Sequence, residues 1–312
     1  MYGERMRMSG QIVEALCSVV RTKEQIMLEE PMSGHTTFRI GGPAKLFITP
    51  MDSRELARVL DLCQSSGISW TILGNGSNLL VSDSGFDGAV IQIGKGFDAV
   101  SIEGCQVCAG AGALLAQAAR GACDMGLTGL EFATGIPGTM GGAVVMNAGA
   151  YGSEMKDVLR SVQVLTGDGR EIEVPAGELE LGYRTSSILK NGWIVLGVRL
   201  LLQKGDRGAI DERVKELTAA RKAKQPLGYP SAGSTFKRPE GCFAGKLIQD
   251  AGLKGFRVGG AQVSEKHSGF VINRGGATAS DVMELCRQVS ERVKAQFGVE
   301  LELEVKTLGE FP

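Results

Sequence analysis

The stretch Leu73-Gly74-Asn75-Gly76-Ser77-Asn78-Leu79-Leu80 follows directly on Trp70–Leu73, a run that predicts a β-strand. Glycines after a strand let backbone N–H groups approach an anion closely, and Ser77 and Asn78 add side-chain donors. Such a loop can hold a diphosphate without a lysine. Taken alone, a stretch of this kind is more often a plain turn, so its meaning depends on the rest of the chain.

Glycine is the outlier of the composition, with 45 of 312 residues, about twice the usual ~7%. The glycines gather in clusters, which suggests backbone packed against a ligand. Besides the stretch above there are two clusters. They are Thr36-Thr37-Phe38-Arg39-Ile40-Gly41-Gly42-Pro43-Ala44, and Gly135-Ile136-Pro137-Gly138-Thr139-Met140-Gly141-Gly142 running on to Met146-Asn147-Ala148-Gly149-Ala150-Tyr151-Gly152.

The two standard nucleotide-binding motifs are not present. No G-x-G-x-x-G opens a helix with an acidic residue about 20 positions further on, as a Rossmann fold requires. Gly245-Lys246 is followed by Leu247, whereas a phosphate-binding P-loop needs Ser or Thr there to hold magnesium. If these clusters bind a nucleotide, they do so within a different fold.

The composition of the chain argues against several classes of function. The 34 basic and 35 acidic residues give a net charge of −1, so no basic field favours nucleic acid or a membrane surface. No run approaches the ~20 apolar residues of a membrane helix, and the first ten residues lack the apolar segment of a signal peptide. Cys105 and Cys108 form a C-x-x-C in a stretch that we expect to be a strand, without the partners of a zinc site. We therefore expect no metal, structural thiols and a reducing compartment, the cytoplasm.

The pattern along the chain predicts an α+β fold, without the regular alternation of a doubly wound sheet. We expect a terminal helix over 11–28, a helix capped by Asp52 or Ser53, a hairpin at Gly167-Asp168-Gly169 and a linker over 203–208. Further elements are expected as a strand over 44–49, a helix over 114–125, a strand over 193–202, a helix over 210–224, a short helix ended by Gly252, a strand over 269–273, a helix over 280–296 capped by Ser280, and a strand over 299–305.

With the three clusters in this order and spacing, the chain resembles the UDP-N-acetylenolpyruvoylglucosamine reductase family. The resemblance runs from about residue 30 to 309. It continues through Gly182-Tyr183-Arg184-Thr185-Ser186-Ser187, Ser231-Ala232-Gly233-Ser234-Thr235-Phe236-Lys237-Arg238-Pro239, Gly245-Lys246-Leu247-Ile248 and Glu302-Leu303-Glu304-Val305-Lys306. The short span between Arg184 and the strand at Trp193 leaves no room for the extra substrate loop of one subclass, so the chain resembles the shorter type II group.

The resemblance implies two FAD-binding subdomains of the PCMH type, over 1–88 and 89–204, and an α+β substrate-binding domain over 205–312. It implies non-covalent FAD, because neither His35 nor His267 lies in a flavin-attachment motif. The residues implied in cofactor binding are Arg39, Gly74, Asn75, Gly76, Ser77, Asn78, Leu79, Gly135, Ile136, Pro137, Gly138, Thr139, Gly142, Asn147 and Gly149.

The implied reaction reduces UDP-N-acetylglucosamine enolpyruvate to UDP-N-acetylmuramate with NADPH, a step of peptidoglycan synthesis. By resemblance, Arg184 faces the negative charge that builds up beside the substrate carboxylate, and Ser234 donates a proton. Glu304 orients donors or, if protonated, donates. Lys224 and Arg238 match family positions that bind the UDP diphosphate.

From the residues alone the less specific interpretations stay open. Arg184 can be a surface arginine, and Ser234 a turn serine. Alternation of Leu301, Leu303 and Val305 with three glutamates predicts that Glu304 lies on a solvated strand face, and only the family match selects it. Lys306 replaces the family's arginine, and Leu303 a common proline.

Two other functions compete with the reductase. An FAD oxidase of the vanillyl-alcohol-oxidase superfamily, to which the resemblance assigns the FAD-binding subdomains, would explain the glycine clusters but not the Arg184 and Ser234 motifs. A non-enzymatic nucleotide-binding protein that keeps a relic site would not need the intact catalytic residues. Because the family acts on small molecules without a partner protein, we expect a monomer.

Overall fold

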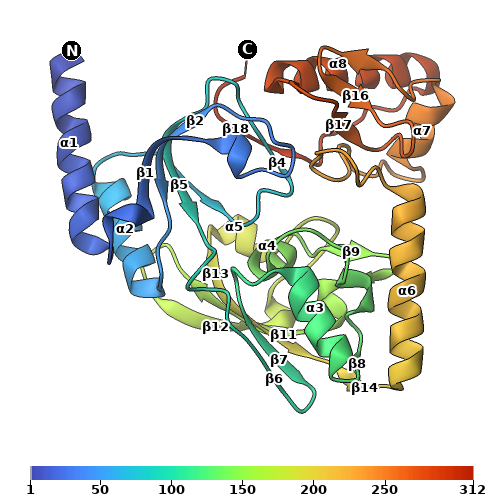
Figure 1. Cartoon of the computed structure of the whole chain (residues 1–312), viewed down its shortest axis with the longest axis horizontal. Helices are drawn as coiled ribbons and strands as arrows, with labels where there is room; N and C mark the ends of the chain where they lie inside the picture. The colour runs from blue at the N-terminus through green and yellow to red at the C-terminus, as the bar shows by residue number, and fades with distance from the viewer. Residues whose placement is uncertain (1, 312) are drawn as a thin grey trace. The chain divides into compact units, whose positions relative to one another are not determined.

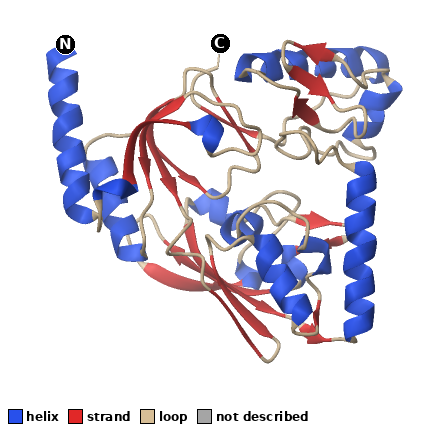
Figure 2. Ribbon diagram, viewed as in Figure 1, coloured by secondary structure: helices blue, strands red, loops and turns tan. Residues whose placement is uncertain are grey.

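The computed structural model describes the backbone of residues 2–311 and the side chains of residues 11–311. Helices and strands are mixed along the chain (Figures 1 and 2), which confirms the predicted α+β class. The helices are α1 Tyr2–Val19, α2 Ser53–Ser65, α3 Leu115–Asp124, α4 Met140–Val145, α5 Ser187–Asn191, α6 Arg207–Lys224, α7 Ala244–Asp250 and α8 Ala279–Phe297.

Within residues 2–311, the β-structure consists of three sheets and three strand pairs. The four-stranded sheet has the order β1 (Ile26–Pro31), β2 (Pro43–Ile48), β5 (Phe86–Gln92), β3 (Trp70–Leu73). The five-stranded sheet has the order β12 (Glu171–Pro175), β11 (Leu159–Leu165), β13 (Ile194–Leu201), β7 (Gln106–Gly110), β6 (Val100–Glu103). The third contains β15 (Arg257–Val258), β16 (Ala261–Val263) and β17 (Val271–Asn273). The pairs are β4 (Leu79–Val81) with β18 (Lys306–Leu308), β8 (Leu127–Thr128) with β14 (Gln203–Lys204), and β9 (Gly149–Ala150) with β10 (Ser153–Glu154).

The chain forms two compact units, each built from three separate segments. Unit 1 comprises residues 1–27, 46–75 and 88–219, and unit 2 comprises residues 28–45, 76–87 and 220–312. Each unit has its own core of buried apolar side chains. In unit 1 helix α4 packs on β7 and β13, and in unit 2 helix α8 packs on β15 and β16.

Local sequence signals account for α2 and β3, the helix and the strand that precede the glycine loop at residues 74–79. Asp52 caps α2, since its carboxylate accepts the N–H groups of Arg54 and Glu55 at 2.9 Å each. The apolar residues on the buried face of this helix are Leu56, Val59 and Cys63. Strand β3 has the predicted bounds and pairs in parallel with β5, so the glycine loop begins where the strand ends.

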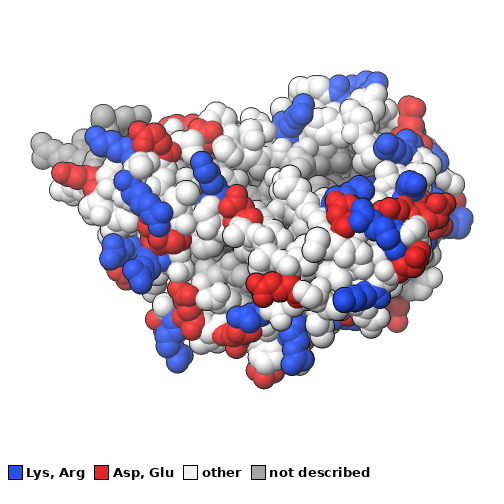
Figure 3. Space-filling view, turned by 60° about the horizontal axis from the view of Figure 1, so that its bottom comes forward, with Lys and Arg blue, Asp and Glu red and all other residues white. Residues whose placement is uncertain are grey.

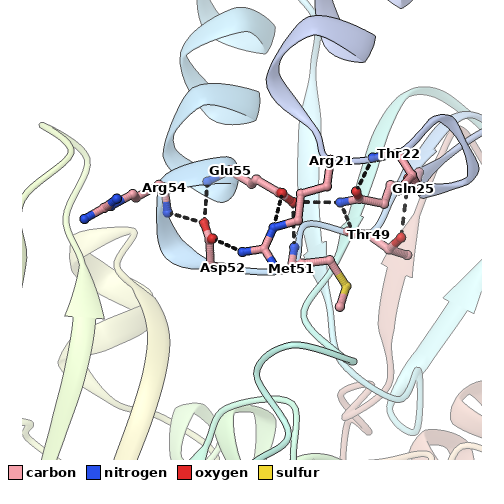
Figure 4. A network of polar contacts seen from close by, with 8 residues as sticks. All are labelled: Arg21, Thr22, Gln25, Thr49, Met51, Asp52, Arg54 and Glu55. Carbon is pink, nitrogen blue, oxygen red and sulfur yellow. Dashed lines mark hydrogen bonds and ion pairs between the residues drawn. The ribbon is translucent and has the colours of Figure 1, made fainter.

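A polar network joins the end of α1 to the start of α2 within unit 1 (Figure 4). The Glu55 carboxylate is buried; it accepts Gln25 Nε2 at 2.7 Å and the Met51 N–H at 2.8 Å. Arg21 forms ion pairs with Asp52 and, at 3.0 Å, with Glu55. The Gln25 side chain also donates to the Thr49 carbonyl at 3.0 Å. These contacts hold the segment that follows α1 against the connection between β2 and α2 and against the first turn of α2.

Several expected elements are wrong in their bounds. The terminal helix ends at Val19, and residues 26–28 belong to β1 instead. The stretch 101–108 is a hairpin whose turn contains Gly104 and Cys105, not one strand. The expected linker contains β14, which pairs with β8, and helix α6 begins inside it at Arg207.

Two errors concern the C-terminal part. The cap of α8 is Thr278, whose hydroxyl accepts the Asp281 N–H, while Ser280 lies inside the helix and donates to Asp83 at 2.7 Å. Residues 299–305 form no strand; β18 begins at Lys306, and Leu303 makes only an isolated bridge to Phe236.

Candidate active site

The loop after β3 is tightly folded at both of its glycines. In unit 1 a Cβ on Gly74 would lie 2.4 Å from the Thr139 hydroxyl oxygen, so only glycine permits this approach without a shift of Thr139. In unit 2 Gly76 has φ +58°, and a Cβ there would lie 2.1 Å from the His35 carbonyl oxygen. The geometry therefore requires both glycines, because other parts of the protein pack closely against them.

Unit 1 contains a cavity of about 270 Å³, near the lower end of the ~300–1,000 Å³ typical of small-molecule sites. Its lining includes Gly74, Asn75 and Thr139, three of the predicted cofactor residues. The sequence analysis missed the polar residues that complete the lining, which are Gln92, Lys95, Asp98 and Gln117. A signal exists for Lys95, because Gly94-Lys95-Gly96 begins two residues after the end of β5 and forms a glycine pair close behind a strand.

The segment Gly135–Thr139 is held against the wall of this cavity. The Gly138 carbonyl accepts the Leu115 N–H at 3.1 Å, and the Met140 N–H donates to the Ala113 carbonyl at 2.8 Å. Gly138 has φ +126°, which favours glycine. Thr139 caps α4 by accepting the Gly142 N–H at 3.4 Å. Two of the three glycine clusters thus meet in unit 1, through Gly74 and Thr139.

Asn147 and Gly149 are packed against other residues of the protein. Asn147 is 1% exposed, and its side-chain amide bonds Glu154, Gly182 and Lys156. Gly149 pairs with Glu154 in the β9–β10 hairpin, where a Cβ would lie 2.8 Å from that of Glu154. Neither residue lines the cavity of unit 1.

Arg184 lies in a tight turn of unit 1. Gly182 and Thr185 form a bridge and exchange backbone hydrogen bonds of 3.1 and 3.4 Å, which leaves Tyr183 and Arg184 at the tip. Arg184 has φ +55°, a left-handed conformation that costs a residue other than glycine roughly 1–2 kcal/mol. Its guanidinium carbon lies 5.2 Å from the centre of the Tyr183 ring.

Ser234 and Glu304 lie on two paired segments of unit 2. The Glu304 N–H donates to the Thr235 carbonyl at 2.8 Å, and the Lys237 N–H donates to the Glu302 carbonyl at 2.8 Å. Glu304 is 8% exposed, whereas Glu302 and Glu300 face solvent and pair with Lys237 and Lys294. The interpretation of Glu304 as part of a solvated face is therefore wrong, because the expected strand does not form.

The remaining predicted residues of unit 2 take different positions. Arg39 is exposed with φ +54°, and Lys224 is exposed in the last turn of α6. Arg238 is exposed, with its guanidinium carbon 4.5 Å from the centre of the Phe243 ring. His267 is half-buried, and burial together with Lys254 and Lys224 lowers the pKa of its imidazole.

Metal and thiol chemistry find no support in the described part of the chain. Residues 11–311 contain no group of three or more His, Cys, Asp or Glu placed to hold a metal ion. All seven cysteines are free, and burial raises the pKa of the Cys63 and Cys123 thiols to about 11. These two side chains act as structural, apolar groups, as expected.

Basic and acidic side chains alternate over much of the face shown in Figure 3. Arg170 with Asp168 and Lys190 with Glu180 are examples of the exposed ion pairs of the molecule. Such a mixed surface fits the near-neutral net charge. Among the described helices, none combines the length and the apolar character that crossing a bilayer requires.

The residues present fit FAD. The cavity of unit 1 is lined by Gly74 and Asn75 of the glycine loop and offers Lys95, Gln92 and Gln117 as polar partners. An FAD binding domain model matches residues 44–175. The fold and the cavity thus define an FAD-dependent oxidoreductase.

The particular family follows from the C-terminal part and from the whole chain. The model of the UDP-N-acetylenolpyruvoylglucosamine reductase C-terminal domain matches residues 225–308. The reductase of that name from Clostridium perfringens (strain SM101 / Type A) is 50% identical over 287 residues, 92% of this chain and 94% of the relative. That from Agathobacter rectalis is 52% identical over 298 residues, 92% and 95% of the two chains.

A solved structure agrees. UDP-N-acetylenolpyruvylglucosamine reductase from Thermus caldophilus has 39% sequence identity and a TM-score of 0.79, and the match covers 91% of this chain and 100% of that one. The chain belongs to the UDP-N-acetylenolpyruvoylglucosamine reductase family, FAD-dependent enzymes of peptidoglycan precursor synthesis.

Proposed function

We propose that this chain reduces the enolpyruvyl group of UDP-N-acetylglucosamine enolpyruvate to the lactyl ether of UDP-N-acetylmuramate, with NADPH as the hydride donor. The observation that carries the proposal is the match to reductases of this name over 92% of the chain, with the Arg184, Ser234 and Glu304 motifs in place. Bound FAD supplies hydride transfer, first from NADPH and then to the substrate double bond.

We assign charge stabilisation to Arg184. Hydride addition beside a carboxylate builds negative charge on the substrate, and a fixed cation at that position lowers the barrier. The tight turn supports this role, because it holds the Arg184 backbone in one strained conformation before the substrate binds.

We assign proton donation to Ser234 and orientation of its surroundings to Glu304. The pairing of Thr235 with Glu304 keeps these neighbours in register within unit 2. A serine hydroxyl is a weak acid, so it needs a partner or a water to replace its proton, and positioned proton transfer contributes ~10²–10⁴-fold in rate. The burial of the Glu304 side chain supports a role apart from solvent.

For the UDP diphosphate we propose Lys224 and Arg238. Both side chains are exposed in unit 2, and stacking on Phe243 limits the freedom of the Arg238 guanidinium. For FAD we keep as a proposal the predicted residues of the loop 74–79, the segment 135–139, Arg39 and Gly142.

We also propose that the enzyme acts as a cytoplasmic monomer with two FAD-binding subdomains, over 1–88 and 89–204, and a substrate-binding domain over 205–312. Free cysteines support a reducing compartment. The family match of residues 225–308 supports the last division. Sedimentation velocity of the purified protein at several concentrations tests the monomer, because a concentration-dependent shift would contradict it.

The proposed function is tested by anaerobic visible spectra of the purified protein, taken as isolated, after NADPH, and after addition of the enolpyruvyl sugar nucleotide. Flavin bands that bleach with NADPH and return with the sugar nucleotide are the expected result. Bands that bleach but do not return would leave a flavoprotein with another acceptor. A colourless protein that FAD does not reconstitute would overturn the proposal altogether.

A further inference from the structure

Asn147 combines a left-handed backbone conformation with almost complete burial, which is unusual for a residue other than glycine. Its backbone has φ +40°, a conformation that favours glycine, and the residue is 1% exposed. Every polar atom of its side chain is engaged by protein. The amide nitrogen donates to Glu154 Oε2 at 2.9 Å and to the Gly182 carbonyl at 3.1 Å, and the amide oxygen accepts the Lys156 N–H at 2.9 Å.

The bond to Gly182 fixes the first residue of the turn that carries Arg184. On the other side of Arg184, the fully buried Ser186 donates its hydroxyl to the Val145 carbonyl at 2.8 Å. The two anchors lie two residues before and two residues after Arg184. Both reach the same short segment, the end of α4 and the residues that follow it, 145–147.

Glu154 in turn fixes the orientation of the Asn147 amide. Its carboxylate accepts one amide hydrogen, and an ion pair with Lys156 holds the carboxylate. Since the N–H of Lys156 donates to the amide oxygen, a flipped Asn147 amide would break the bonds at both ends. The amide therefore has one satisfied orientation, which presents a donor to Gly182.

We propose that Asn147 is a positioning residue that holds the Arg184 turn in its working conformation. This inference rests on the proposed function and goes beyond it by giving Asn147 a role through Arg184 instead of through the cofactor. The side chain has no polar atom left for FAD, although the sequence suggested such a contact. Because hydride addition depends on the exact place of the charge, a displaced Arg184 slows that step alone.

The test is the variant Asn147→Gly, which keeps the left-handed backbone and removes only the side chain. In stopped-flow measurements on the FAD-loaded enzyme, reduction by NADPH keeps its rate and the flavin content is unchanged. Reoxidation by the enolpyruvyl sugar nucleotide slows by about a hundredfold, the scale of a ~1 Å misplacement. The loss is in kcat, with KM for the sugar nucleotide changed little.

A double variant separates positioning from general damage. If Asn147 acts through Arg184, the variant Asn147→Gly/Arg184→Ala reoxidises no more slowly than Arg184→Ala. Additive losses, a lower flavin content or slower reduction by NADPH would overturn the proposal. Reoxidation that is unaffected by Arg184→Ala, or that fails in the unmodified enzyme, would overturn it together with the proposed function.

Two further variants serve if Asn147→Gly does not fold. Glu154→Ala removes one of the two acceptors of the Asn147 amide, so the amide is held less firmly towards Gly182 and reoxidation slows, whereas Glu154→Gln keeps an acceptor oxygen and restores most of the rate. Equal effects of the two changes would contradict the proposal. Glu180→Gly is the matched control for Asn147→Gly, because Glu180 also has a left-handed backbone, φ +44°, but lies in the segment before the Arg184 turn and forms an exposed ion pair with Lys190.

Discussion

The side-chain amide of Asn78 donates a hydrogen bond to the backbone carbonyl of Glu304 at 3.2 Å, across 226 positions of the chain. The N–H of Lys306, the first residue of β18, returns a bond of 3.0 Å to the carbonyl of Asn78, the residue before β4. The end of the glycine loop and the proposed catalytic carboxyl therefore share one framework within unit 2. A change at Asn78 should displace Glu304.

We expect Asn78→Ala to lower the free energy of unfolding by about 1 kcal/mol, the typical value of one hydrogen bond. Its flavin reoxidation should slow as well, because the backbone of Glu304 loses its side-chain donor. Urea unfolding and stopped-flow absorbance at the flavin band measure the two effects. The control is Asn191→Ala at the exposed end of α5, which should match the unmodified enzyme in both.

Ser234→Ala should keep NADPH-driven flavin reduction and lose most of the reoxidation by the sugar nucleotide, by ~10²–10⁴-fold. The reason is that the proposed proton transfer belongs to the second half-reaction only. Single-turnover stopped-flow traces measure each half separately, with Ser231→Ala in the same loop as the control. Normal reoxidation in Ser234→Ala would remove this serine from the mechanism.

Gly76→Ala should lose FAD, because its Cβ would lie 2.1 Å from the His35 carbonyl oxygen and 2.9 Å from Thr36 Cα. Backbone atoms cannot move aside as a flexible side chain can, so the loop must shift. The ratio of flavin to protein absorbance after purification measures the retained cofactor. Gly177→Ala is the control, since nothing lies within 4 Å of its Cβ. A variant at Gly76 with full flavin content would contradict the cofactor role of this loop.

Glu55→Ala should destabilise the protein by roughly 2–4 kcal/mol, because it leaves the Met51 N–H without its acceptor and removes one of the two acceptors of the buried Gln25 amide, the other being the Thr49 carbonyl. The midpoint of urea unfolding should fall, with an unchanged slope. Glu103→Ala, at an exposed position of β6, should stay within ~0.5 kcal/mol of the unmodified protein. A midpoint unaffected by Glu55→Ala would mean that the network of Figure 4 does not contribute to stability.

We expect the protein to lose folding stability in acid when the carboxyl of Asp83 takes up a proton. Burial alone would raise the pKa of its carboxyl, but the N–H groups of Ala279 and Ser280 and the Ser280 hydroxyl outweigh burial and lower that pKa below its ordinary 3.8. A lowered pKa in the folded state means that the stabilisation is present above about pH 4 and is lost as the pH falls through the folded-state pKa.

Thermal unfolding from pH 6 to pH 3 measures this contribution. Asp83→Asn should have a lower melting temperature at pH 6 and a smaller drop towards pH 3, since the titrating group is gone. Parallel curves for the variant and the unmodified protein would show that Asp83 has no part in the acid loss.

The sequence predicted best those structural features that depend on contacts between residues close together in the chain. The cap at Asp52 and the bounds of β3 depend on contacts a few residues apart, and both predictions are confirmed. Ser280 was taken for a cap because its actual partner, Asp83, lies 197 positions away. The strand over 299–305 was wrong for the same reason, since Thr235 and Asn78 bind the Glu304 backbone outside any sheet. Family resemblance, not periodicity, found Glu304.

The sequence predicted which residues belong to the candidate site better than it predicted the contacts that their side chains make. Gly74 and Thr139 could be assigned to one wall from their motifs, and the structure brings them together. The use of Asn147 could not be predicted, because its partners Glu154, Lys156 and Gly182 lie 7, 9 and 35 positions away, in no recognisable spacing.

The division of each unit into three chain segments orders events during synthesis. The last residue of unit 1 is Ala219, so its whole sequence is available while the final third of the chain is still being made. Unit 2 needs β18 beside β4, and that parallel pair closes a span of more than two hundred residues. Strand β4 must therefore wait until β18 has been synthesised before it finds that partner. A ribosome-bound chain stalled at residue 260 should resist protease in unit 1 and be cut next to β4.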